Sequence, residues 1–153
     1  MQLEGTRTLD APPEEVWPAL FTCAVLAQSI PGCESLEQTS ETTFTAVVKL
    51  KIGPVSARFK GVAELSDIVP HLSCTLSGKG SGGIAGFAKA AAQVTLGADG
   101  QQTILRYHAD VAVGGKLAAL GNRLIGATAQ KLTDEFFTNF QAVLSNEKGK
   151  ALA

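Results

Sequence analysis

The sequence predicts an α+β domain in which a curved antiparallel sheet of about seven strands closes around one long C-terminal helix. Three observations predict it. Stretches of alternating apolar and polar residues recur from the N-terminus to about Val113, which is typical of half-buried strands. Between the first two stretches, a proline-containing segment has apolar residues at helical spacing and predicts two short helices. After Gly114-Gly115, apolar residues return every three or four positions as far as about Leu144, as on one face of a helix.

The first strand and the short helices are marked by local patterns. Residues 3–9 alternate, and Arg7 is in phase with the leucines, so we expect it to reach solvent from the strand end, or else to face a wet interior. Residues 10–15 place two prolines and two glutamates at a helix start, where both residue types are favoured. Pro18 limits this helix to a short one, and residues 24–29 predict a second short turn.

The clearest hairpin is centred on Gly53-Pro54. A two-residue turn there pairs Ile52 with Val55 and puts the apolar residues of both strands on one face, as a single register requires. The same register collects four basic residues on the outer face of the sheet. They form either a solvated surface or a docking patch for an acidic partner or anionic headgroups, and they are Lys49, Lys51, Arg58 and Lys60.

Residues 78–86 are rich in glycine. The pattern Gly78-x-Gly80-x-x-Gly83 matches a dinucleotide fingerprint, but the preceding strand alternates and no acidic residue follows about twenty positions later at a strand end. No Gly-Lys pair is followed by Ser or Thr, which excludes a P-loop. We therefore expect these glycines to let the sheet bend or turn, or to form a mobile lid over a cavity.

Length, charge and cysteine content limit the class of protein. The 153 residues suit one domain, which we place at residues 1–145 with a polar, frayed tail at 146–153. A net charge of −1 argues against a nucleic-acid binder, and no apolar run approaches the ~18 residues of a membrane span. The N-terminus does not resemble a signal peptide. The three cysteines lack CxxC spacing and indicate reduced thiols in the cytoplasm.

Candidate catalytic residues are few. His71 and His108 are the only histidines, and neither they nor the cysteines have the spacing of a metal site. We therefore expect no catalytic residue, no metal and no cofactor. Tyr107 is a polar residue placed inward on a central strand. It is either a core tyrosine with a satisfied hydroxyl or a hydrogen-bond partner for a ligand.

The order of elements is that of a helix-grip domain, which commonly leaves an apolar cavity between sheet and helix. We expect this cavity to bind one elongated apolar molecule, lipid- or quinone-like, and the alternative is a filled core. The expected lining residues are Phe59, Leu76, Tyr107, Val111, Leu120, Leu124 and Thr128. Those expected around its entrance are Phe21, Ile30 and Phe87.

Several stretches carry a resemblance to a known family, namely residues 10–17, 30–36, 53–55, 82–87, 114–118 and 121–125. The Pro-Gly-Cys and Gly-Gly-Lys-Leu segments are fairly specific. Through them the chain resembles, over about residues 1–144, the family of the carbon monoxide dehydrogenase G subunit. That family belongs to the START-like and Bet v 1-like SRPBCC superfamily, and the resemblance implies a helix-grip fold with a hydrophobic ligand pocket.

The resemblance also implies a function. The chain would be a non-catalytic accessory protein of a molybdenum hydroxylase of the carbon monoxide dehydrogenase type, acting in its maturation, membrane recruitment or electron transfer to quinone. The implied location is the cytoplasm, with peripheral contact at the inner face of the membrane. Two alternatives stay open: a small enzyme of the polyketide cyclase/dehydratase type, and a pure protein-interaction module that uses the basic sheet face.

Overall fold

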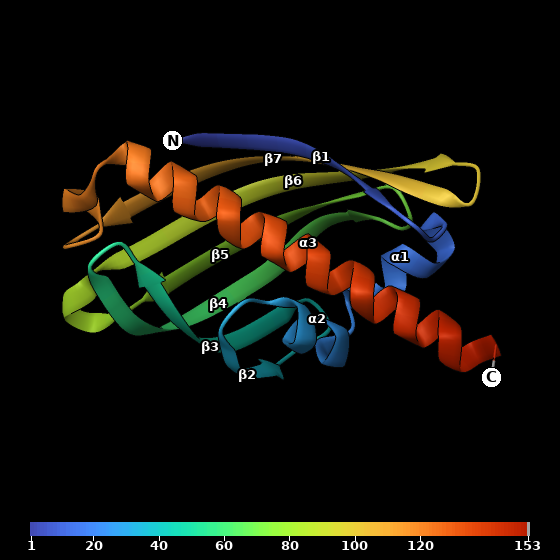
Figure 1. Ribbon diagram of the computed structural model, residues 1–153, viewed down its shortest axis with the longest axis horizontal. Helices are drawn as coiled ribbons and strands as arrows, with labels where there is room; N and C mark the ends of the chain where they lie inside the picture. The colour runs from blue at the N-terminus through green and yellow to red at the C-terminus, as the bar shows by residue number, and fades with distance from the viewer. Residues whose placement is uncertain (153) are drawn as a thin grey trace.

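The computed structural model describes residues 1–152, and side chains as far as residue 146. Its elements follow the predicted order (Figure 1). In chain order they are β1 (Gln2–Leu9), α1 (Pro13–Leu20), α2 (Cys23–Ser29), β2 (Cys33–Gln38), β3 (Thr43–Ile52), β4 (Val55–Val69), β5 (Ser73–Ser81), the 3-10 turn η1 (Gly83–Ala85), β6 (Phe87–Asp99), β7 (Gln102–Gly114), the 3-10 turn η2 (Ala118–Leu120) and α3 (Asn122–Leu152).

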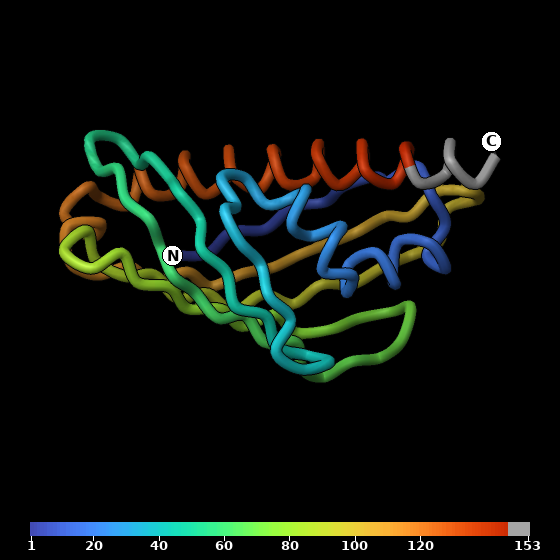
Figure 2. The backbone as a smooth tube through the Cα atoms, turned by 90° about the horizontal axis from the view of Figure 1, so that it is seen from below, coloured from blue at the N-terminus to red at the C-terminus, as the bar shows by residue number. Residues whose placement is uncertain are grey.

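The seven strands form one antiparallel sheet. Its strand order is β1-β7-β6-β5-β4-β3-β2, so every neighbour except the β1–β7 pair is also consecutive in the sequence. Helix α3 lies along one face of this sheet, and α1 and α2 cover the same face at one end (Figures 1 and 2). The predicted fold class, a seven-stranded antiparallel sheet with a long C-terminal helix and two short helices, is confirmed.

The predicted β3–β4 hairpin has the expected register. Ile52 pairs with Val55 and Val48 with Phe59, so the apolar residues of both strands face α3. Gly53 has φ +58°, a left-handed conformation that glycine adopts without steric cost. The alternating pattern fixed this register because a shift of one residue would turn every apolar side chain to solvent.

The long helix differs from the prediction at both ends. It does not begin directly after Gly114-Gly115, because η2 intervenes and Gly121, with φ +88°, breaks the chain before Asn122. Leu117 is buried in the resulting bend and Leu120 ends η2. At the other end α3 continues to Leu152, beyond the point where a frayed tail was expected. Glu, Lys and Ala in that segment are good helix formers, which accounts for the difference.

The buried apolar side chains form two separate cores. The first lies at the end that carries α1 and α2, and consists of Leu9, Ala11, Val16, Trp17, Ala19, Val25, Phe44, Leu65, Cys74, Leu96, Leu105, Phe140, Val143 and Leu144. The second lies at the end that carries η1, η2 and the β3–β4 turn, and consists of Ile52, Phe59, Ala85, Leu117 and Ile125. Helix α3 contributes Phe140, Val143 and Leu144 to the first core and Ile125 to the second, so the two cores contact different parts of the helix.

The glycine-rich segment forms a tight turn around η1. The Gly82 N–H donates to the Gly86 carbonyl (2.8 Å), and the Leu117 N–H donates to the Ala85 carbonyl (3.1 Å). Gly86 has φ +111°, and a Cβ placed there would lie 2.1 Å from the carbonyl oxygen of Gly114. These contacts agree with the turn that the glycines predicted and fix η1 against the end of β7.

Replacing Gly86 with alanine should therefore destabilise the fold strongly. A left-handed conformation alone costs a non-glycine residue ~1–2 kcal/mol, and the clash with Gly114 should bring the loss to about 3 kcal/mol or more. Gly83→Ala is the matched control, because Gly83 is also left-handed (φ +63°) but a Cβ there meets nothing within 4 Å. Urea unfolding followed by circular dichroism measures both, and equal losses would contradict this account of the turn.

Candidate functional site

The middle of the inner sheet face, the face turned to α3, is lined by small side chains. The register places one residue of each of four neighbouring strands in a row across this face, and they are Ala63, Gly78, Ala90 and Val111. Leu76 belongs to the next row, opposite Leu65. Although it faces α3, its side chain is 38% exposed, whereas Leu65 is 8% exposed. The inner face between the two cores is therefore apolar and accessible.

The residues predicted to line a ligand site are divided among the first core, the second core and the inner face between them. Tyr107 packs against the first core, while Phe59 and Leu120 belong to or pack against the second. Leu124 leans on the β3–β4 turn, since its Cδ2 atom would lie 2.8 Å from a Cβ at Gly53. The half-buried or exposed residues that belong to neither core are Leu76, Val111, Leu124 and Thr128.

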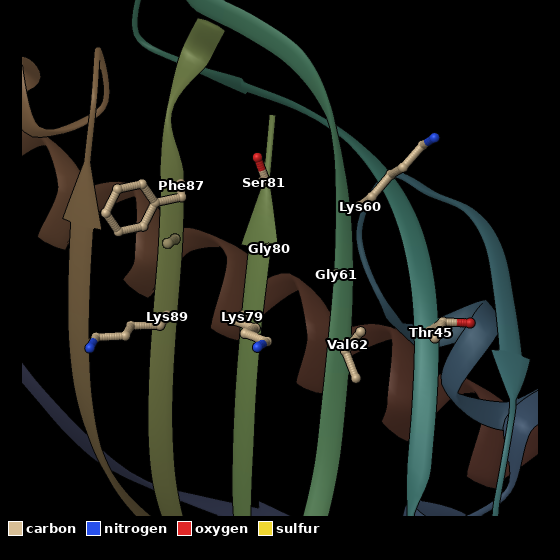
Figure 3. A pocket seen from close by; sticks show the side chains of 10 residues that line it. Thr45, Lys60, Gly61, Val62, Lys79, Gly80, Ser81, Phe87 and Lys89 are labelled. Carbon is tan, nitrogen blue, oxygen red and sulfur yellow. The ribbon is translucent and has the colours of Figure 1, made fainter. Parts of the chain in front are cut away.

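The residues predicted to surround an entrance do not lie together. Phe21 packs on Trp17 with ring centres 4.9 Å apart, at the end of the sheet that carries α1 and α2. Ile30 directly follows α2. Phe87 begins β6 at the opposite end and points to the outer face, away from α3 (Figure 3). The reason is that successive side chains of a strand point to opposite faces of the sheet. Ala88 and Ala90 face inward, so Phe87 must face outward.

Tyr107 has an unusual environment for a core tyrosine. Its ring stacks on Phe137 of α3 with centres 6.1 Å apart. Its hydroxyl is buried and has no hydrogen-bond partner among the described residues. The hydroxyl lies over Gly5 of β1, where a Cβ would come within 2.5 Å of the oxygen. Buried hydroxyls are normally hydrogen-bonded, so the unpaired Tyr107 hydroxyl is an exception on the inner face.

Arg7 is half-buried on the inner side of the edge strand β1. It faces α3 and forms an ion pair with Asp134, and its guanidinium carbon is 5.7 Å from the centre of the Phe137 ring. The side chain of Arg7 is 31% exposed and its guanidinium contacts α3, so the alternative of an inward-facing Arg7 describes it better than a strand-end residue that reaches solvent. The alternation that puts Arg7 in step with Leu3 and Leu9 indicated an inward-facing side chain, but its partner Asp134 is 127 positions away in the sequence, and no local pattern pointed to it.

The structure brings few candidate catalytic groups together. Within the described part of the chain, no cluster of three His, Cys, Asp or Glu side chains could hold a metal ion. Over the same residues, no helix has the length and apolar character needed to cross a membrane. His108 lies on the outer face, with its Nδ1 atom 3.7 Å from a carboxylate oxygen of Glu4.

The basic patch predicted from the hairpin lies on the outer face. Lys49 is directly opposite Arg58, and all four of its members, Lys49, Lys51, Arg58 and Lys60, are exposed. The Arg58 Nε atom donates to a carboxylate oxygen of Glu34 at 2.7 Å. This hydrogen bond and the charge of Glu34 raise the pKa of Arg58. The four side chains are thus exposed to solvent, and one of the four cations has an acidic neighbour.

A hollow of about 480 Å³ lies on the outer face beside this patch, with α3 behind the sheet (Figure 3). A second hollow of about 590 Å³ adjoins it and shares Val62, Lys79 and Lys89. The first is lined by Thr45, Lys60, Gly61, Val62, Lys79, Gly80, Ser81, Phe87, Ala88 and Lys89. Both lie on the other side of the sheet from the predicted ligand site, and no pattern in the sequence had marked Lys79 or Lys89.

Comparison with known proteins decides the family. The family model of the carbon monoxide dehydrogenase G subunit (CoxG) matches residues 5–145. The chain belongs to the CoxG family. A comparison with curated proteins found no match.

Solved structures agree with the CoxG assignment. A conserved protein from Geobacillus kaustophilus is 32% identical, with a TM-score of 0.90 over 95% of this chain and 96% of that one. A START superfamily protein from Mycobacterium smegmatis is 13% identical, with a TM-score of 0.68 over 95% and 97%. The Zhui aromatase/cyclase from Streptomyces sp. R1128 is 12% identical, with a TM-score of 0.68 over 95% and 93%. This CoxG chain therefore has the START and Bet v 1-like fold of the SRPBCC superfamily.

The cysteines of this CoxG chain allow a direct chemical test. Cys23, Cys33 and Cys74 are unpaired, and burial raises the pKa of Cys33 and of Cys74. A raised pKa lowers the thiolate fraction at a given pH. Thiol counting on denatured, unreduced protein should find three thiols, and Cys74 should react much more slowly in the native protein than in urea. A count of one, or equally fast labelling of Cys74 in both states, would contradict this.

Proposed function

We propose that this chain is a non-catalytic accessory protein that binds one elongated apolar molecule, lipid- or quinone-like, between α3 and the centre of the sheet. The observation that carries the proposal is Leu76, which faces α3 on a central strand and is nevertheless 38% exposed. Apolar pockets with few polar groups are typical of small-molecule sites. Membership of a superfamily of ligand-binding folds supports the same conclusion.

The lining suits a flexible apolar chain. Small residues on the central strands leave room, while the larger side chains of the two cores lie on either side of them. Each ligand CH₂ group removed from water there would contribute ~0.8 kcal/mol. Specificity for length then follows from the distance between the two cores, because a longer chain would have to displace well-packed residues.

One polar group on the inner face can orient such a ligand. The Tyr107 hydroxyl is buried without a partner and can donate to a carbonyl or hydroxyl oxygen at one end of the molecule. Arg7 already pairs with Asp134. We therefore assign the ligand a polar head beside Tyr107 and an apolar tail toward Leu76 and Val111.

The residues around Leu76 and Val111 support a carrier rather than an enzyme. Catalysis by proton transfer needs titratable groups that converge on one reacting atom. Around Leu76 and Val111, the facing positions of neighbouring strands are Ala63, Gly78, Ala90 and Ala92. The shared fold with an aromatase/cyclase at 12% identity concerns the fold alone.

Family membership suggests the partner. We propose a molybdenum hydroxylase of the carbon monoxide dehydrogenase type, in the cytoplasm, that the chain serves in maturation, membrane recruitment or electron transfer to quinone. The exposed patch of Lys49, Lys51, Arg58 and Lys60 is the proposed contact with an acidic surface of that enzyme. Such charges would mainly accelerate association and would be screened by salt.

Replacing Leu76 with tryptophan tests the ligand site. In an open site the extra bulk should change the free energy of unfolding by less than about 1 kcal/mol and should abolish binding of a fluorescent fatty acid or a decyl-quinone analogue. In a filled core it should cost ~1–3 kcal/mol. Gln93→Trp, on the outer face of the adjacent strand, is the control and should retain binding. A destabilised Leu76→Trp variant whose parent never binds either probe would refute the carrier proposal.

Replacing Tyr107 with phenylalanine tests the polar anchor. Because the hydroxyl has no partner among the described residues, its removal should leave stability unchanged or slightly higher. Affinity for the decyl-quinone analogue should fall about tenfold, the value of one hydrogen bond. Affinity for decylbenzene, which offers no oxygen, should stay the same. Equal losses for both probes would mean that Tyr107 acts only through packing.

A further inference from the structure

The buried polar side-chain atoms that lack a partner lie close together on the inner face. Among the described residues, every buried side-chain nitrogen or oxygen atom without a hydrogen-bond partner belongs to Arg7 or to Tyr107. The register of β1 and β7 pairs Arg7 with Leu105 and Gly5 with Tyr107, so Arg7 and Tyr107 are diagonal neighbours on one face. Such neighbours are about 7–8 Å apart. One small ligand group can therefore reach both side chains.

Phe137 of α3 holds both side chains in place. The guanidinium carbon of Arg7 is 5.7 Å from the centre of the Phe137 ring, and the ring of Tyr107 stacks on it with centres 6.1 Å apart. One turn further along α3, the side-chain oxygen of Gln141 accepts a hydrogen bond from the Asp10 N–H at 2.8 Å and fixes the helix beside the end of β1. The two polar groups are thus positioned by packing before any ligand arrives.

Arg7 uses a carboxylate of the chain itself as its counter-ion. Its Nη2 atom forms the ion pair with Asp134, and its buried Nε atom has no partner. These two nitrogens form one edge of the guanidinium, the kind of edge that binds a carboxylate through two parallel hydrogen bonds. Asp134 therefore uses only part of the binding capacity of this edge.

Asp134 can leave Arg7 at small cost, whereas Arg7 needs a counter-ion. The side chain of Asp134 is 52% exposed, and the Gln130 Nε2 atom donates to the same carboxylate oxygen at 3.1 Å. Without Arg7, the Asp134 carboxylate would keep Gln130 and water as partners. Arg7 is only 31% exposed and is always charged. Because a charge withdrawn from water has to be paired, another anion has to replace Asp134 if it leaves.

We propose that the ligand carries a carboxylate, which displaces Asp134 from Arg7. The two carboxylate oxygens accept hydrogen bonds from Nε and Nη2 of Arg7, and the Tyr107 hydroxyl donates to one of them. The apolar chain of the ligand runs from there along the inner face toward Leu76 and Val111. The ligand class is then an ionised long-chain carboxylic acid.

Charge favours this class over a lipid with a neutral head. A carbonyl or hydroxyl group that displaced Asp134 would leave Arg7 without a counter-ion. A neutral head that left Asp134 in place would have only the Tyr107 hydroxyl as a partner. A carboxylate replaces the lost charge, and its two oxygens have enough lone pairs for all three donors.

The return of Asp134 gives the site a means of release. Since it competes with the bound carboxylate for the same nitrogens, it lowers the affinity and lets the ligand exchange, as a carrier requires. The carboxylate site rests on the proposed function, because a head group is held here only if an apolar chain binds on the inner face.

The test compares three molecules by titration calorimetry of the whole chain at neutral pH: dodecanoate, dodecanol and the decyl-quinone analogue. Dodecanoate should bind about tenfold or more tightly than dodecanol, because its hydrogen bonds are charge-assisted. Arg7→Gln should abolish this difference and leave the affinity for dodecanol unchanged. Arg106→Gln, the same change on the outer face of β7, is the control and should preserve the difference.

Arg7→Lys is the second variant, used if circular dichroism shows that Arg7→Gln does not fold. It keeps the charge beside Asp134 but lacks the edge of two nitrogens. The affinity for dodecanoate should therefore fall in Arg7→Lys as well, while that for dodecanol should not change.

Removal of the competing carboxylate is the sharper test. Asp134→Asn should raise the affinity for dodecanoate about threefold or more, because Arg7 is then always available to the ligand. Glu135→Gln removes the same charge from the next residue of α3 and should change neither affinity. A residue that merely held Arg7 in position would have the opposite effect, since its loss would weaken the binding of dodecanoate.

The outcomes separate the carboxylate site from the carrier proposal. Equal binding of dodecanoate and dodecanol, equal losses of both in Arg7→Gln, or weaker dodecanoate binding in Asp134→Asn would overturn the carboxylate site alone, because an apolar molecule still binds in each case. If none of the three molecules binds the parent chain, the carrier proposal fails and the carboxylate site fails with it.

Discussion

A single helix cannot cover a seven-stranded sheet. Strands lie about 4.8 Å apart, so seven of them span roughly 29 Å, whereas a helix with its side chains is about 10–12 Å wide. The rest of the structure responds to this mismatch. Helices α1 and α2 cover one end of the inner face, the turns η1 and η2 close the other, and the apolar residues between them cannot all be buried. The division into two cores and the exposure of Leu76 follow from it.

The two faces of the sheet consequently have different chemistry. The inner face is apolar, with Tyr107 as a polar group that the described residues leave unpaired. The outer face carries the lysines and the hollow between them. Because side chains alternate along a strand, Lys79 and Lys89 lie next to Gly78 and Ala90 of the inner face. One thin sheet can therefore separate a ligand from a charged surface.

Features that depend on neighbouring residues could be predicted from the sequence, and those that depend on distant contacts could not. Alternation around Gly53-Pro54 is local, and it was enough to predict the register of β3 and β4. A single glycine inside a helical pattern is ambiguous, so the break at Gly121 was missed. The face of Phe87 depended on where β6 begins, which the glycines before it obscure.

The candidate site shows the same limit. The alternation of apolar and polar residues correctly predicted that Leu76, Tyr107 and Val111 lie on the inner face. It could not tell which of them would be buried, because that depends on how much of the sheet α3 covers. The pairing of Arg7 with Asp134 joins the first strand to the last helix, and no local pattern encodes a contact of that range.

The position of Trp17 has a spectroscopic consequence. It is the only tryptophan of the chain, it lies in the first core, and its ring centre is 4.9 Å from that of Phe21 and 6.2 Å from that of His71. Intrinsic fluorescence therefore reports on one half of the molecule and is blind to the half around Ile52 and Leu117. Loosening of that second half, whether by heat, by a bound molecule or by a substitution in η1, would escape a melting curve followed by tryptophan fluorescence and would register in circular dichroism, calorimetry or amide exchange.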